Sequence, residues 1–270
     1  MKPREESFID LHCHLVAGVD DGAATESETR QMLEVAQRDG IGTIVATPHL
    51  FSSHSSEKDP QVVFKKVESL VSACSSPDSP VKVVPGAEVF FTSNLFELLM
   101  EFKHHLTLNQ SSYFLLEFPF NFIFHGASEF MYRVMMEGLI PVIAHVERNS
   151  VIQRNPRLAY EMVQMGALCQ VNAASFTGYF GEVAEDTARL LLKHNLIHVL
   201  ASDAHSPSDR RPEFSSIIAQ LESEGFSQAG ALASDVPRAI IHDEGVPDIG
   251  IAEDPAQQKS IFDFFRKKFK

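Results

Sequence analysis

The sequence predicts an α/β protein in which parallel strands form a barrel. Short apolar runs rich in β-branched residues alternate with longer segments of helical periodicity. Because these runs are apolar throughout, both faces of the sheet should be covered by helices, as in parallel sheets. Seven runs favour a TIM-like (β/α)7 barrel, and an open doubly wound sheet is the competing architecture. The expected strands are 7–11, 43–46, 81–85, 113–116, 139–144, 167–171 and 197–201.

The segments between these strands have the spacing of amphipathic helices. Several are followed by a glycine, as helix ends often are: Gly40, Gly138 and Gly166. No internal repeat and no long low-complexity linker divides the chain, so residues 1–270 are expected to form one domain. The expected helices are 26–39, 60–73, 95–101, 126–137, 155–165 and 182–193.

The overall composition argues against several classes of protein. The 270 residues carry a formal net charge of −13, which is unfavourable for a general nucleic-acid-binding surface. The chain opens without an apolar signal region, and no stretch approaches the length of a membrane span. The three cysteines, Cys13, Cys74 and Cys169, are too widely spaced to suggest a disulfide framework. The cytoplasm is therefore the expected compartment.

Histidines and carboxylates follow six of the seven expected strands. His12 and His14 are two residues apart, so both side chains should lie on one face of an extended segment. The carboxyl ends of barrel strands form the rim that carries active sites. A carboxylate such as Glu88 could bridge two cations, which is the geometry of two-metal hydrolysis. The other candidates are Asp20 and Asp21 in the first loop, and His49, Glu117, His145, Asp203 and His205; the sixth strand ends in Asn172.

Other motifs weigh less in favour of catalysis. A histidine by itself is more often a core or surface residue, and we interpret His104, His105, His194 and His198 in this way. Cys13 should point away from the neighbouring histidines and pack in the core. The sequence has neither a Gly-x-Ser-x-Gly elbow nor the nucleotide-binding glycine motifs, and no cysteine is followed by arginine six positions later. A metal-dependent hydrolase is therefore favoured over a serine or cysteine hydrolase.

The strand-end motifs together resemble the PHP (polymerase and histidinol phosphatase) superfamily, whose first motif is His-x-His. More specifically, the chain is similar to the bacterial metal-dependent tyrosine-protein phosphatases of capsule and exopolysaccharide clusters. The similarity spans about residues 8–211 in family order. The segments that carry it are Asp10-Leu-His-Cys-His-Leu15, Val19-Asp-Asp-Gly22, Ala46-Thr-Pro-His-Leu50, Pro85-Gly-Ala-Glu-Val89, Leu115-Leu-Glu-Phe118, Ile143-Ala-His-Val-Glu-Arg148 and Ala201-Ser-Asp-Ala-His205.

This resemblance implies a distorted barrel that holds three divalent metal ions, usually manganese, with iron or zinc as alternatives. It also implies two arginines that hold the phosphate. Arg148 matches the first directly, whereas the second falls at Arg210 or Arg211; ungapped counting favours Arg210, and the Arg-Pro pair favours Arg211. We select Arg210. The implied metal ligands are His12, His14, Asp21, His49, Glu88, Glu117, His145, Asp203 and His205.

The implied activity is hydrolysis of phosphotyrosine in proteins, with a role in regulating capsule or exopolysaccharide synthesis. A metal-bound hydroxide would attack phosphorus while Arg148 and Arg210 stabilise the phosphate oxygens. His205 or another histidine could protonate the leaving phenolate. The alternatives are another PHP phosphoesterase, such as a histidinol-phosphate phosphatase or a phosphodiesterase, a more distant amidohydrolase, or a non-catalytic metal-binding regulator.

Two departures from the family pattern affect substrate choice rather than the metal ligands. The loop before Asp20 reads Leu15-Val16-Ala17-Gly18, where the branch commonly has a proline. The segment 114–130 is rich in phenylalanine. These rings are interpreted as packing residues, with an aromatic substrate pocket as the alternative.

The C-terminal residues, about 258–270, predict a basic amphipathic helix because Ile261, Phe264, Phe265 and Phe269 fall at helical spacing. The helix could pack on the barrel, or it could dock on an acidic membrane surface or a partner kinase. The expected partner is a phosphotyrosyl protein, in particular a bacterial tyrosine kinase of polysaccharide export. The expected location is the cytoplasm, with peripheral contact at the inner membrane surface.

Overall fold

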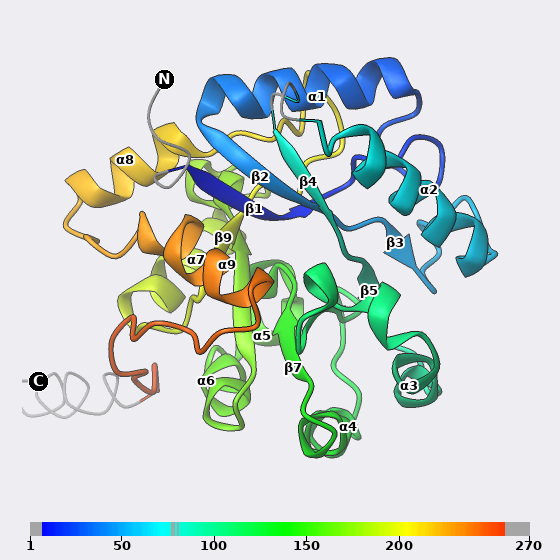
Figure 1. Ribbon diagram of the computed structural model, residues 1–270. Helices are drawn as coiled ribbons and strands as arrows, with labels where there is room; N and C mark the ends of the chain where they lie inside the picture. The colour runs from blue at the N-terminus through cyan, green and yellow to red at the C-terminus, as the bar shows by residue number, and fades with distance from the viewer. Residues whose placement is uncertain (1–6, 77–78, 80, 257–270) are drawn as a thin grey trace, which may run out of the picture.

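The computed structural model describes residues 7–76, 79 and 81–256, in which strands alternate with helices (Figure 1). Helices surround the strands in this view, as expected of an α/β barrel. The strands are β1 (Phe8–Cys13), β2 (Ile41–Ala46), β3 (His49–Leu50), β4 (Lys82–Pro85), β5 (Glu88–Phe90), β6 (Tyr113–Glu117), β7 (Ile140–Ile143), β8 (Leu168–Asn172) and β9 (Val199–Ala201).

The helices follow the expected segments closely and add three. Those expected are α1 (Glu26–Asp39), α2 (Pro60–Ala73), α3 (Leu95–Leu106), α4 (Ala127–Met136), α6 (Arg157–Gln164) and α7 (Glu182–Lys193). Those not expected are α5 (Ser150–Arg154), α8 (Ser215–Ser223) and α9 (Asp235–Ile241). The C-terminal helix expected at 258–270 lies outside the described residues. No helix in the described part of the chain has the length and apolar character needed to cross a membrane.

The paired strands are all parallel. They form one sheet in the order β1-β2-β4 and a second in the order β3-β5-β6-β7-β8-β9. Along the chain, β3 directly follows β2, and β5 directly follows β4. Because β3 pairs with β5 just as β2 pairs with β4, β3 is the continuation of β2 and β5 is the continuation of β4. When β2 is counted with β3 and β4 with β5, the structure has the seven barrel strands that the sequence predicts. At the open edge, Cys13 of β1 bridges to Ala204 beyond β9, and the His14 amide donates to the Ala204 carbonyl at 2.9 Å.

The interruption between β4 and β5 has a steric basis. A Cβ on Gly86 would lie 2.6 Å from Cγ1 of Val45 on the neighbouring strand, so only glycine permits this close approach. Beyond the break, the Glu88 amide donates to the Pro48 carbonyl at 3.1 Å and pairing resumes. The break therefore shifts the chain without losing register, and it places Glu88 at the start of β5.

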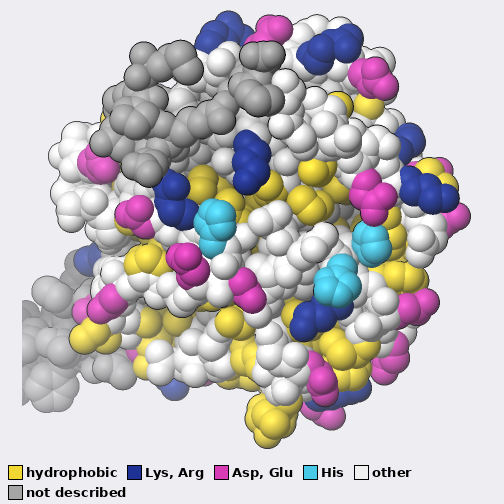
Figure 2. Space-filling view, in the orientation of Figure 1, with side chains coloured by type: hydrophobic (Ala, Val, Ile, Leu, Met, Phe, Trp, Pro, Cys, Tyr) yellow, Lys and Arg dark blue, Asp and Glu magenta, His cyan; other side chains and the backbone are white. Residues whose placement is uncertain are grey.

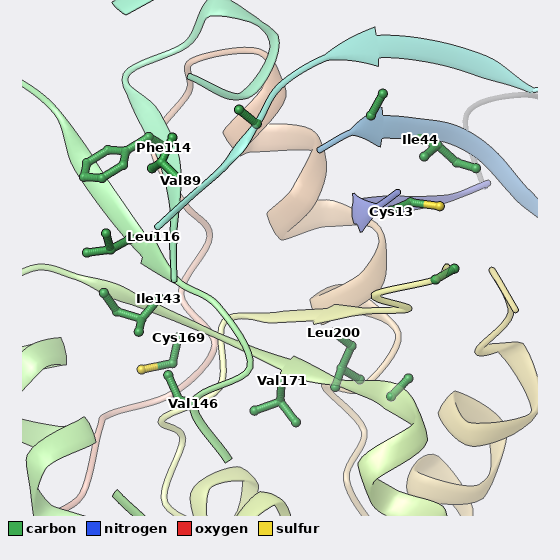
Figure 3. Close-up of a cluster of buried hydrophobic side chains, with 14 of the residues drawn as sticks. Cys13, Ile44, Val89, Phe114, Leu116, Ile143, Val146, Cys169, Val171 and Leu200 are labelled. Carbon is green, nitrogen blue, oxygen red and sulfur yellow. The ribbon is translucent and has the colours of Figure 1, made fainter. Parts of the chain in front are cut away.

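Alternation along the strands separates two apolar layers. Phe114 and Leu116 belong to the cluster between strands and helices, where Figure 3 shows them with Ile143 and Val171. Leu115 belongs to a second, inner cluster that also receives apolar residues from α9. Because the period of a strand is two, the face that holds Tyr113 and Leu115 carries Glu117 two residues later. The inner face thus changes from apolar residues to polar ones toward the carboxyl ends of the strands.

The helices that cover the barrel begin and end at recognisable caps. Thr25 accepts a hydrogen bond from the Glu28 amide at the start of α1, and Gly40 ends this helix with φ 89°. Asp59 caps α2, which has Pro60 at its first position. On the face shown in Figure 2, lysine and arginine side chains are scattered among acidic ones rather than gathered into a basic stripe.

Candidate metal centre and phosphate-binding arginines

All nine expected ligands converge at the carboxyl ends of the strands, with Glu88 at their centre. Glu88 is fully buried. Its Oε2 lies 3.2 Å from Nε2 of His12, 3.5 Å from Nε2 of His14 and 2.9 Å from Nδ1 of His49. Its Oε1 lies 3.0 Å from Nε2 of His145. One carboxylate therefore faces four imidazoles, two from the end of β1, one from β3 and one from the end of β7.

Asp21 and His205 form the more exposed side of the cluster. Oδ1 of Asp21 lies 3.4 Å from Nε2 of His205 and 3.6 Å from Nε2 of His49. The rings of His14 and His205 have centroids 4.0 Å apart. The Asp21 side chain is 45% exposed, whereas both histidines that it faces are buried. This side is therefore the one that solvent and substrate can reach.

Asp203 and Glu117 are the remaining two carboxylates of the cluster. Oδ1 of Asp203 lies 3.4 Å from Nε2 of His12 and 3.5 Å from Nε2 of His14. Oε2 of Glu117 lies 3.5 Å from Nδ1 of His49. Asp203 has φ 52° and His145 has φ 31°, left-handed values that non-glycine residues rarely adopt. Such strain concentrates at functional sites, where the surrounding structure enforces it.

The donor atoms fall into three overlapping sets, within each of which all atoms lie within 4.8 Å of one another. Because the sets share His14, His49 and Glu88, cations bound to them would be close neighbours. His145 and Asp203 fall outside the three sets but contact their members. Among the described residues, the sets are His14, Asp21, His49 and His205; His12, His14 and Glu88; and His49, Glu88 and Glu117.

Several of these donors lack an ordinary hydrogen-bond partner. Nδ1 of His49, Oε2 of Glu88 and Oε2 of Glu117 are buried and accept or donate no hydrogen bond. Buried polar atoms are almost always satisfied, because an unsatisfied one costs about 1–3 kcal/mol. Here the three atoms point at one another, which is what a shared cation would require. Imidazole and carboxylate donors together suit manganese, iron or zinc, so the residues fit a polynuclear metal centre.

The carboxylates strongly affect the protonation of their histidine neighbours. Burial disfavours the charged form of His14, but the Asp20 carboxylate outweighs burial and raises the pKa of His14 to about 9. Burial likewise opposes protonation of His49, yet Glu88 and Glu117 raise the pKa of that residue to about 11. In contrast, burial and the nearby charge of His14 lower the pKa of His205 to about 4. Without cations, protons therefore balance the carboxylates at His14 and His49.

Two arginines border the centre and meet at Asp203. Nη1 of Arg148 lies 3.1 Å from Oδ2 of Asp203, and Nη2 of Arg210 lies 2.5 Å from the same oxygen. Burial opposes ionisation of Asp203, but His12 and Arg210 hold its pKa well below the usual range. Nε of Arg210 is buried and has no hydrogen-bond partner. Arg211 instead pairs with Glu213 at the surface, so Arg210 is the residue of this pair that faces the centre.

Three further side chains orient the ligands, and sequence reasoning gave none of them this role. Oδ2 of Asp20 lies 2.9 Å from Nδ1 of His14 and accepts from the His49 amide at 3.0 Å. Oε1 of Gln170 lies 3.2 Å from Nδ1 of His12. Nδ2 of Asn172 donates to Oδ2 of Asp203 at 2.7 Å. The available signal was alternation on β8, which puts Gln170 and Asn172 on the inner face.

The phenylalanine-rich segment divides into packing residues and exposed ones. Phe114, Phe118 and Phe130 are buried, as expected for packing. In contrast, Phe120, Phe122 and Phe124 are 37–43% exposed, and the Phe120 ring lies 5.3 Å from the His145 ring. The packing interpretation is therefore confirmed for the three buried rings, and the substrate pocket stays a prediction for the exposed ones.

The remaining histidines and the cysteines behave as packing or surface residues. His198 accepts a hydrogen bond from the Cys169 amide at 3.2 Å, and His105 stacks on Phe64. Nδ1 of His194 hydrogen-bonds the Leu190 carbonyl at 2.8 Å. None of these histidines belongs to a ligand set in the described residues. Cys13, Cys74 and Cys169 are free and buried, as expected. Cys13 packs in the apolar cluster between strands and helices (Figure 3).

Comparison with known proteins places this site in a family. The tyrosine-protein phosphatase YwqE of Bacillus subtilis is 32% identical over 258 residues, which cover 96% of this chain and all of YwqE. The tyrosine-protein phosphatase CpsB of Streptococcus pneumoniae is 33% identical over 245 residues, covering 88% of this chain and 99% of CpsB. Both relatives therefore align over nearly their whole length.

Solved structures agree with this assignment. A crystal structure from work on YwqE and CpsB, described as unique metal-dependent tyrosine phosphatases, matches with a TM-score of 0.81 and 33% identity, over 92% of this chain and 98% of that one. A histidinol phosphate phosphatase from Lactococcus lactis shares the fold alone, with a TM-score of 0.51 and 13% identity over 83% of this chain and 94% of its own. Residues 8–242 match the family described as capsular polysaccharide synthesis, CpsB/CapC. The chain therefore belongs to the CpsB/CapC family.

Proposed function

We propose that this chain is a metal-dependent phosphatase that hydrolyses phosphotyrosine in proteins and acts in capsule or exopolysaccharide synthesis. One observation carries the proposal: a cluster of nine histidines and carboxylates is bordered by two arginines that meet at one of its carboxylates. The names of the relatives, which are tyrosine-protein phosphatases, support the same activity. The metal ligands are proposed to be His12, His14, Asp21, His49, Glu88, Glu117, His145, Asp203 and His205.

Three neighbouring cations are proposed because the donors form three overlapping sets. Manganese is the preferred identity, with iron or zinc as alternatives. Bound there, divalent cations would supply a water-derived nucleophile near neutral pH and neutralise charge on the phosphate oxygens. The buried surroundings of Glu88 would strengthen these electrostatic interactions.

Arg148 and Arg210 are proposed to bind the phosphate. Both side chains are about one-fifth exposed, so they lie between the buried cluster and solvent. A guanidinium presents paired donors that match two phosphate oxygens, and it keeps its charge at any physiological pH. The unpartnered Nε of Arg210 offers one such donor. Substrate phosphate would share these arginines with Asp203, which now contacts both.

The geometry favours His205 as a ligand over His205 as an acid. Nδ1 of His205 lies 3.0 Å from the Asp203 carbonyl, an acceptor that requires a hydrogen on this nitrogen. Nε2 is then the free ligand atom, and it faces Asp21 at 3.4 Å. A phenolate is a comparatively good leaving group and has little need of a protein acid.

The test is a comparison of three substrates with one protein preparation. With manganese added, a phosphotyrosyl peptide should turn over far faster than histidinol phosphate or a phosphodiester. Faster turnover of histidinol phosphate would move the chain to the rival phosphatase class. Absence of turnover on all three would leave a non-catalytic metal-binding protein.

The physiological partner is proposed to be a bacterial tyrosine kinase of polysaccharide export at the inner membrane surface. The proposal rests on the capsule-synthesis family and on the basic, phenylalanine-rich C-terminal sequence. Removing residues 258–270 should weaken binding to anionic vesicles while leaving peptide turnover unchanged. Equal vesicle binding by the shortened and full-length chains would contradict the membrane contact.

A further inference from the structure

Two phenylalanine rings enclose the guanidinium of Arg148. Its Cζ lies 4.6 Å from the centroid of Phe120, in the loop after β6, and 4.2 Å from the centroid of Phe180, in the loop after β8. The Phe180 centroid is also 5.7 Å from Cζ of Arg210. Two loops that are far apart in sequence thus place aromatic rings around both proposed phosphate-binding residues.

The rings leave the arginine free to bind an anion. A guanidinium stacks on aromatic rings through its flat faces, whereas its N–H donors lie in the plane of the group. Stacking therefore restricts the motion of Arg148 without occupying the donors that phosphate needs. Nη1 of Arg148 in addition donates a hydrogen bond to Oδ2 of Asp203 at 3.1 Å, which restricts the head group further while its other donors stay available to phosphate.

The two rings differ in exposure and in neighbours. Phe120 is 37% exposed, and its ring also lies beside the His145 ring, at 5.3 Å between centroids. It therefore forms part of the surface that a substrate meets beside the metal ligands. Phe180 is partly buried and contacts both arginines. Phe120 is thus placed to contact the organic group of a phosphate ester, whereas Phe180 is placed to hold the arginines.

We propose that Phe120 and Phe180 form an aromatic clamp on Arg148 that makes the site selective for aryl over alkyl phosphate esters. Phe120 is the specificity residue, which packs against the aromatic ring of the leaving group. Phe180 is a positioning residue, which fixes Arg148 and Arg210 for the phosphate. The inference rests on the proposed phosphatase function and extends it to the origin of its substrate selectivity.

The test uses leucine substitutions, which keep apolar bulk and remove the aromatic face. The variants are Phe120→Leu and Phe180→Leu, with Phe122→Leu as a matched control, since Phe122 lies in the same loop, is exposed and meets the Phe124 ring edge to face. Each manganese-loaded protein is assayed with a phosphotyrosyl peptide, with glycerol phosphate, and for inhibition by inorganic phosphate. Metal content and thermal unfolding are measured in parallel.

Phe120→Leu should lower kcat/KM for the peptide about tenfold, mainly through KM, because the contact with the aromatic leaving group is lost. Glycerol phosphate turnover and phosphate inhibition should weaken only about twofold, because Phe180 and Asp203 still hold Arg148. Phe180→Leu should weaken phosphate inhibition and the turnover of both esters about tenfold at unchanged metal content. Phe120→Tyr and Phe180→Tyr keep a ring face and should restore each activity.

Three outcomes would overturn the clamp while leaving the phosphatase assignment intact. These are Phe120→Leu behaving like Phe122→Leu, an equal loss on both esters in Phe120→Leu, and unchanged phosphate inhibition in Phe180→Leu. Absence of turnover in the unmodified, metal-loaded protein would instead overturn the proposed function, and the clamp with it.

Discussion

Buried histidines occur at both ends of this barrel, and their surroundings give them opposite properties. At the carboxyl ends of the strands, His14 and His49 face Asp20, Glu88 and Glu117, which raise the pKa of the two histidines to about 9 and about 11. At the amino end of β9, His198 forms no ion pair with a carboxylate of the described residues, and burial lowers its pKa to about 4.

Burial alone does not explain the difference between these pKa values. His14 is 0% exposed and His198 is 9% exposed, so both are nearly removed from water. The difference is that His14 lies beside carboxylates, whereas His198, among the described residues, does not. Carboxylates attract a positive charge, which either a proton or a metal ion can supply. A cation site in this molecule is therefore defined by histidines and carboxylates that share a buried position, not by histidines alone.

Removing the central carboxylate should have the largest effect. Glu88→Gln keeps the shape of the side chain but removes the charge that four histidines face. We expect at least about a hundredfold lower turnover of p-nitrophenyl phosphate, together with loss of bound metal by elemental analysis.

Glu68→Gln is the control for this change, because Glu68 also faces a histidine, His105, but at the surface. It should leave both activity and metal content unchanged. Normal turnover in Glu88→Gln with a full metal complement would refute the central role of this carboxylate.

The two adjacent arginines allow a sharp test of phosphate binding. Arg210→Ala should lower turnover about a hundredfold at unchanged metal content, because Arg210 faces the centre. Arg211→Ala should stay within about twofold, because Arg211 pairs with Glu213 at the surface. Equal effects of the two substitutions on kcat/KM would show that the side-chain directions do not decide the role.

Metal affinity should rise with pH. In the cation-free centre, the raised pKa values of His14 and His49 mean that both carry protons at pH 7. A cation must displace these protons, so each one released makes binding about tenfold tighter per pH unit below the pKa. Titration calorimetry with Mn²⁺ at pH 6.5 and 7.5 should show at least about a tenfold change. A pH-independent Kd would mean that His14 and His49 are already neutral before the cation binds, which would contradict their raised pKa values.

The histidine at the amino end should show its effect in stability rather than in catalysis. The folded-state pKa of His198 is about 4, below its unfolded value, so the unfolded chain binds this proton first. Its contribution to stability is therefore complete above about pH 6.5 and is lost as pH falls toward 4. Between pH 7.5 and 5.0 the loss should be about 2 kcal/mol.

Urea unfolding of the unmodified protein and of His198→Gln, at the two pH values, measures this contribution. Groups common to both proteins cancel in the difference. The variant should lose about 2 kcal/mol less than the unmodified protein on acidification. The same pH dependence in both proteins would show that His198 is protonated without cost in the folded state.

Much of the fold could be predicted from the sequence because each strand is a short apolar run between helices. Alternation also predicted that Cys13 would pack outward from the two histidines beside it. The interruption of two barrel strands, one into β2 and β3 and the other into β4 and β5, was not predicted. It depends on contacts between strands, such as the approach of Val45 to Gly86, that no single segment encodes.

In the candidate site, too, features carried by a single segment were predicted, and features that depend on contacts between strands were not. Ligands at strand ends were visible in sequence because barrel strands bring their carboxyl ends together. The residues that orient them were not, since Gln170 and Asn172 act through partners on other strands. Ungapped counting selected Arg210 over Arg211 against the signal of the Arg-Pro pair, and only the fold gives the direction of each side chain. Short helices such as α5 and α9 were missed because each is too short to show a clear period.

The central claim is that the histidines and carboxylates at this rim hold cations on which phosphatase activity depends. The most direct test is to remove all metal with a chelator, confirm its absence by elemental analysis, and measure phosphotyrosyl-peptide turnover before and after adding manganese. The metal-free protein should be inactive, and manganese should restore its activity. Full turnover in the verified metal-free protein would contradict this claim.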